Sequence, residues 1–103
     1  MPGLGRQLLA TLKDVNALLE DTNDKNRKAE LEQQASKLVK QISELVEKTL
    51  NEADQEYKDA EKGLKDASKT CKEAVKGLQS VAEAIEKVAD AISLVEKLIA
   101  AVG

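Results

Sequence analysis

Apolar residues recur every three or four positions from Leu4 to Val102, with few interruptions. This spacing is the period of an amphipathic α-helix, and it differs from the strict alternation of a half-buried strand. Residues that interrupt helices are scarce, because the only proline is at position 2 and three of the five glycines lie close to the chain ends. The pattern therefore predicts an all-α protein.

Breaks in the pattern divide the chain into four predicted helices, at residues 4–20, 24–50, 52–77 and 80–102. The first break is the run Asp-Thr-Asn-Asp at 21–24, whose side chains compete for backbone hydrogen bonds and can cap the following helix. At the second break we expect Asn51 to be an N-cap, because acidic residues crowd the start of the next segment and lysines crowd its end, as the helix dipole favours.

The third break is the run Gly-Leu-Gln-Ser at residues 77–80. Gly77 can adopt the left-handed backbone conformation that ends many helices, and Ser80 and Glu83 have the spacing of a capping box. Four segments of similar length with short connections predict an up-and-down antiparallel four-helix bundle, formed by a single helical domain over residues 1–103.

An unbroken heptad phase runs from Leu50 to Val102. Its a positions are Leu50, Tyr57, Leu64, Cys71, Leu78, Ile85, Ile92 and Ile99, and its d positions are Ala53, Ala60, Ala67, Ala74, Val81, Val88, Val95 and Val102. The alanines allow a neighbouring helix to approach closely. Because the phase also continues through 77–80, an alternative stays open: a long central helix from about 24 to 77 with a short helix or helical hairpin at each end, in a dimeric coiled coil.

The side chains that usually carry chemistry are sparse. Histidine is absent, which removes the commonest general base near neutral pH and the commonest transition-metal ligand. Cys71 is at an a position, where apolar surroundings would raise its pKa. We expect Tyr57 in the core or at its edge, with its hydroxyl reaching solvent. We therefore predict no enzyme activity, no catalytic residue, no cofactor, no metal and no small-molecule substrate.

Charge and targeting signals limit the partners. The net charge of −3 gives no overall attraction to nucleic acid or anionic lipid. Six lysines line the outer face of the third segment, but nearby acidic residues favour a solvated face: Lys58, Lys62, Lys65, Lys69, Lys72 and Lys76. A lone cysteine and an N-terminus without the apolar core of a signal peptide predict a cytoplasmic location.

The last segment is the most apolar, and its apolar surface extends beyond the heptad seam to Leu94 and Leu98. Either the first helix covers this flank inside the bundle, or these two leucines form a protein-docking face. The leading hypothesis is a non-enzymatic helical interaction or scaffold module that binds other protein chains or copies of itself. The alternative is a membrane-active bundle that exposes its apolar C-terminal helix, although the acidic charge of that helix disfavours membrane entry.

Overall fold

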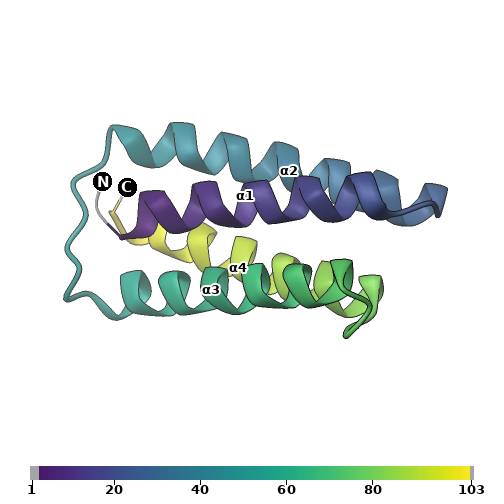
Figure 1. Ribbon diagram of the computed structural model, residues 1–103. Coiled ribbons are helices and arrows are strands. Elements are labelled where there is room, and N and C mark those ends of the chain that lie inside the picture. Colours follow the sequence, from purple (N-terminus) through teal and green to yellow (C-terminus); the bar gives the residue numbers. More distant parts are fainter. Residues whose placement is uncertain (1–2, 103) are drawn as a thin grey trace.

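The computed structural model describes residues 3–102, which form four α-helices packed side by side (Figure 1). Helix α1 spans Leu4–Asp21, α2 spans Lys25–Val46, α3 spans Gln55–Val75 and α4 spans Val81–Val102. The bundle measures 39 × 21 × 18 Å with a radius of gyration of 13.2 Å, close to the ~13 Å of a compact domain of this length. The predicted all-α four-helix bundle is confirmed.

The connection between α2 and α3 is longer than predicted. Helix α2 ends at Val46 and α3 begins at Gln55, so the alternative of one long central helix is wrong. Asn51 is not the N-cap of α3. Its Oδ1 accepts a hydrogen bond from the backbone N–H of Ala53 at 2.9 Å in a turn that precedes the helix, and Asp54 is the N-cap.

Residues expected to cap helices at the other two breaks do so. Asp24 is the N-cap of α2, where its Oδ1 accepts hydrogen bonds from two backbone N–H groups of the first turn. Gly77 has a φ of 79°, and the Leu78 N–H donates to the carbonyl of Glu73 at 2.8 Å, which is the long bond of a Schellman motif. The hydroxyl of Ser80 then accepts a hydrogen bond from the Glu83 N–H at 3.0 Å.

The four helices form two hairpins that lie against each other: α1 and α2 make the first, and α3 and α4 make the second. Helix α1 packs on α2 and α3, and α4 packs on α2 and α3, so α2 and α3 lie on a diagonal that the 47–54 connection crosses at one end (Figure 1). Consecutive helices run in opposite directions. The contacts between the hairpins are therefore made by parallel pairs, α1 with α3 and α2 with α4.

Polar contacts show the register of each parallel pair. Between α1 and α3, the Leu4 N–H donates to the Tyr57 hydroxyl at 2.9 Å, and the Thr11 hydroxyl donates to the Leu64 carbonyl at 3.1 Å. Both pairs are separated by 53 residues in sequence, and a constant separation is what parallel helices require. The Tyr57 hydroxyl is therefore buried rather than turned toward solvent. It accepts a hydrogen bond from a backbone N–H in the first turn of α1, which has no partner within its own helix.

Heptad positions that lie within α3 and α4 contribute to the core as predicted, whereas the heptad position in the turn between them does not. Leu64, Ala67 and Cys71 are fully buried, whereas Leu78, at the a position in the turn, is 69% exposed. Helices α3 and α4 approach each other closely: a Cβ added to Gly63 of α3 would lie 2.7 Å from Cδ1 of Leu94. The unbroken sequence phase thus runs through a turn that reverses the chain.

Two leucines at equivalent heptad positions test this reversal. Leu64→Ala should lower the free energy of unfolding by about 2–5 kcal/mol, because it leaves a cavity in the core. Leu78→Ala should change it by less than about 0.5 kcal/mol, because Leu78 is exposed. Urea denaturation followed by circular dichroism measures both. Similar losses for the two variants would mean that the heptad continues through residue 78 as one helix.

Candidate functional site

Of the two leucines predicted to form a docking face, one lies in the core of the bundle and the other at its edge. Leu98 is 1% exposed and belongs to the core. Leu94 is half-buried and lies over Gly63, so α3, rather than the first helix, covers it. Binding of a partner by Leu98 would require α4 to leave the bundle, and the docking role of both leucines stays a prediction.

Side chains with reactive groups do not gather into a site. Burial, with a smaller effect of the Asp14 carboxylate, raises the pKa of the Cys71 thiol to about 12, so the thiol is protonated near neutral pH. Within residues 3–102, no three His, Cys, Asp or Glu side chains are placed to hold one metal ion. In the same range, no helix is long and apolar enough to cross a membrane.

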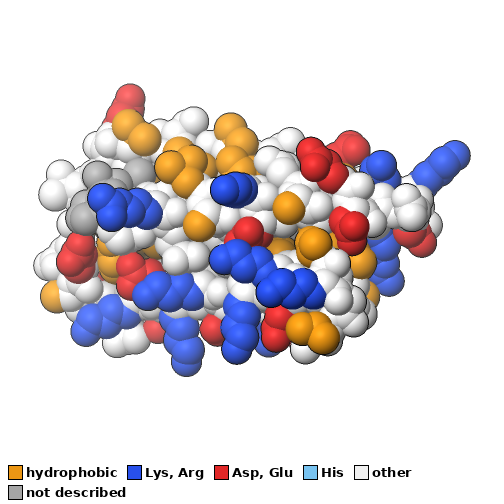
Figure 2. All heavy atoms as spheres, viewed as in Figure 1, with side chains coloured by type: hydrophobic (Ala, Val, Ile, Leu, Met, Phe, Trp, Pro, Cys, Tyr) orange, Lys and Arg blue, Asp and Glu red, His pale blue; other side chains and the backbone are white. Residues whose placement is uncertain are grey.

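Exposed apolar side chains gather on the outer side of the first hairpin. Leu9 is 58% exposed on α1, while Val39 and Val46 are 51% and 65% exposed on α2. Half-buried apolar residues lie between these and the core: Leu12, Leu19, Ala35 and Ile42. We call these seven residues the hairpin face. Figure 2 shows hydrophobic side chains gathered over α1 and α2, with few charged groups among them.

The helix geometry places this face away from the second hairpin. Thr11 contacts α3 and Gln41 contacts α4. Residues two positions apart on a helix are separated by about 160° around its axis. Leu9 and Val39 each precede one of these contact residues by two positions, so both project from the opposite side of their helices.

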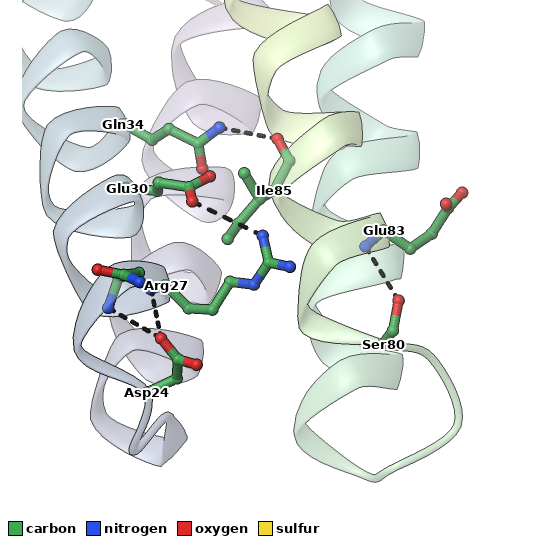
Figure 3. A network of polar contacts seen from close by, with 8 residues as sticks. Asp24, Arg27, Glu30, Gln34, Ser80, Glu83 and Ile85 are labelled. Atoms are coloured by element: carbon green, nitrogen blue, oxygen red, sulfur yellow. Dashed lines mark hydrogen bonds and ion pairs between the residues drawn. The ribbon is translucent and has the colours of Figure 1, made fainter.

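The hairpin face is exposed because α2 buries two glutamines. Gln34 Nε2 donates to the Ile85 carbonyl at 2.8 Å, as Figure 3 shows, and Gln41 Nε2 donates to the Ile92 carbonyl at 2.9 Å. Both pairs are separated by 51 residues, which is the register of the parallel α2–α4 pair. Gln41 Nε2 also lies 3.1 Å from Glu96 Oε1 at the edge of the contact.

This orientation of α2 differs from the one its sequence favours. By hydropathy alone, the inward stripe of α2 would contain Ala35 and Ile42 beside its leucines, whereas the structure turns Gln34 and Gln41 inward between the buried residues Leu31, Leu38 and Leu45. The two glutamines continue the three-four spacing of those leucines, and that spacing is the one sequence signal that could have revealed them. Turning them inward places Ala35 and Ile42 on the outer flank beside Val39 and Val46.

The buried glutamines have an energetic cost. Oε1 of Gln34 and Oε1 of Gln41 are buried without a hydrogen-bond partner among residues 3–102. A buried acceptor left unpaired costs about 1–3 kcal/mol. The carbonyls of Ile85 and Ile92 lie inside α4, where the helix already supplies a donor to each. The bundle thus buries costly amides while valines on the same helix are exposed.

Replacing a buried glutamine tests this cost. Gln41→Leu should raise the free energy of unfolding by about 1 kcal/mol or more, because it removes an unpaired acceptor and buries apolar surface of similar volume. Gln33→Leu, on the exposed side of α2, is the matched control and should have little effect. Chemical denaturation measures both. A loss of stability in Gln41→Leu alone would show that the glutamine bond to α4 outweighs the unpaired oxygen.

Comparisons with known proteins do not assign the chain to a family. No protein-family model matches the sequence, and neither the curated proteins nor the solved structures give a match. The function is therefore inferred from the surfaces and residues described above.

Proposed function

We propose that this protein is a non-enzymatic helical interaction module that binds another protein chain through the hairpin face. The observation that carries the proposal is the orientation of α2, which buries Gln34 and Gln41 while Val39 and Val46 are exposed. A helix selected only for the stability of its own bundle would gain by the opposite arrangement. A contiguous exposed apolar surface is typical of a protein-binding site.

The shape of the hairpin face suits a helical partner. Two antiparallel helices present their apolar flanks on the same side. A partner helix with apolar residues every three or four positions would fit such a surface. The partner is either a different protein or a second copy of this chain, and a module of this kind could act as a scaffold.

A cytoplasmic location is part of the proposal. Cys71 is buried and forms no disulfide, which suits a reducing compartment. The absence of histidine and the protonated Cys71 thiol support a non-enzymatic role.

The membrane-active alternative has weaker support. Its candidate segment is α4, whose residues Val88, Ala91 and Val95 are fully buried in the bundle, so membrane entry would have to open the core. Co-flotation with liposomes at several pH values separates the two proposals. Binding to lipid with release of α4 would favour the alternative.

Charged substitutions on the hairpin face test the proposal. Leu9→Lys with Val39→Lys should weaken binding of a partner by at least about tenfold, because lysines interrupt the apolar contact. Ala82→Lys with Ala89→Lys is the matched control, since both alanines are exposed on α4 and the change in charge is the same. Circular dichroism should show that both variants are folded.

Binding is measured in two ways. Analytical ultracentrifugation up to millimolar concentration detects a second copy as the partner. Affinity capture, followed by titration of each captured protein after purification, detects a different partner. Two results together would contradict the proposal. The protein would be monomeric at all concentrations, and every captured protein would bind the hairpin-face variant as tightly as it binds the α4 control.

A further inference from the structure

Helix α3 carries three consecutive heptads with the same arrangement of charge. Residues 57–63, 64–70 and 71–77 each follow one order: an apolar or aromatic residue, lysine, an acidic residue, alanine, a variable residue, lysine, and glycine or threonine. The lysines are Lys58, Lys65 and Lys72 at one heptad position and Lys62, Lys69 and Lys76 at another, and all six are exposed. We call them the lysine stripe. The acidic residues of the repeat are Asp59, Asp66 and Glu73.

The stripe is narrow and straight. Residues four positions apart on a helix differ by about 40° around its axis, so the two sets of lysines lie side by side. From Lys58 to Lys76 the stripe is about 27 Å long at 1.5 Å per residue. Figure 2 shows lysine side chains along the lower edge of the molecule, over α3, with acidic side chains among them.

Most of the stripe is available to an outside anion. Lys65 Nζ lies 3.8 Å from Glu61 Oε1, and Lys72 Nζ lies 3.8 Å from Asp14 Oδ2. In the part of the chain that the structure describes, the remaining four lysines form no ion pair.

An apolar anchor point lies at the C-terminal end of the stripe. Val75 is 39% exposed and Leu78 is 69% exposed. A groove of about 180 Å³ between α1 and α3 is lined there by Asp14, Ala17, Lys72, Val75 and Lys76. The Asp14 carboxylate is bonded to the Ser68 hydroxyl and paired with Lys72, so its charge is partly compensated within the protein.

We propose that the lysine stripe and this groove bind an acidic helix of a partner protein. Carboxylates at two positions per heptad on that helix would face the two sets of lysines, and a bulky apolar side chain at its end would rest on Ala17 and Val75. Exposed ion pairs contribute little affinity individually, so the apolar contact supplies the anchor. The charge pattern supplies register, specificity and rapid association.

The charge pattern favours a protein helix over a nucleic acid. The acidic residues of the repeat run beside the lysines for the whole length of the stripe, and they would repel a uniformly anionic polymer. A protein helix can place lysine or arginine opposite them. No aromatic side chain is available to stack on a base, because Tyr57 is the only aromatic residue and it is buried.

This inference is independent of the hairpin face. The stripe lies on α3, in the second hairpin, and the two surfaces have different chemistry. A protein that holds one partner on each surface would act as a scaffold. The proposal for either surface can be contradicted without affecting the other.

A synthetic helical peptide tests the proposal directly. The probe is a three-heptad peptide with glutamate at two positions per heptad and leucine at one end, made in two versions with the leucine at either end. The control peptide has glutamine in place of glutamate. We expect the acidic peptide to bind in low salt, as measured by fluorescence anisotropy, and the control peptide to bind at least about tenfold more weakly.

Matched charge reversals locate the contact. Lys62→Glu, Lys69→Glu and Lys76→Glu together should abolish binding of the acidic peptide, and the corresponding Lys→Gln variant should weaken it. The control is Lys25→Glu, Lys37→Glu and Lys40→Glu on α2, which makes the same change in net charge at exposed positions and should retain most of the binding. Val75→Ser should reduce the difference in affinity between the two acidic peptides, which carry the leucine at opposite ends.

Three results would overturn the proposal. The first is failure of both acidic peptides to bind. The second is equal weakening by the α3 and α2 charge reversals, which would indicate long-range charge alone. The third is binding of single-stranded DNA or phosphatidylserine vesicles through the same lysines at least as strongly as the peptide, which would assign the stripe to a polyanion. None of these results depends on the hairpin-face variants.

Discussion

The orientation of α2 about its own axis determines which surface this protein presents. Two glutamines, Gln34 and Gln41, donate hydrogen bonds to carbonyls of α4, one heptad apart and in the same register. These bonds fix α2 with its leucines and amides inward. The same rotation turns Val39 and Val46 outward, so a polar contact inside the bundle creates an apolar surface outside it.

The packing of the two hairpins follows from the same parallel arrangement. Two hydrogen bonds between α1 and α3 span 53 residues each, and two between α2 and α4 span 51 residues each. Small residues allow the close approach of the helices. Thr11 reaches a carbonyl of α3, and Gly63 leaves room for Leu94 between α3 and α4. A core with one aromatic residue thus relies on close contact and on polar bonds that fix the register.

Much of the fold could be predicted from the sequence because its signals are local. Asp24, Gly77 and Ser80 act as caps in the turns where their residue types predict them. The orientation of α2 could not be predicted in the same way, because Gln41 and Ile42 are neighbours and the apolar one appears the better core residue. Gln41 donates to a carbonyl of α4, and that partner is 51 residues away in sequence. Hydropathy alone does not tell which flank a neighbouring helix covers, so the burial of Leu98 in the core could not be predicted from the sequence.

The most direct measurement of the central claim is the reactivity of single thiols on α2. In a Cys71→Ala background, Val39→Cys and Gln41→Cys differ by two positions in sequence and by about 160° around the helix. The structure predicts that the thiol at position 39 reacts with a maleimide nearly as fast as in the unfolded chain, and that the thiol at position 41 is protected until the bundle opens. Rapid labelling at position 41 with protection at position 39 would contradict the orientation of α2 and the origin of the hairpin face.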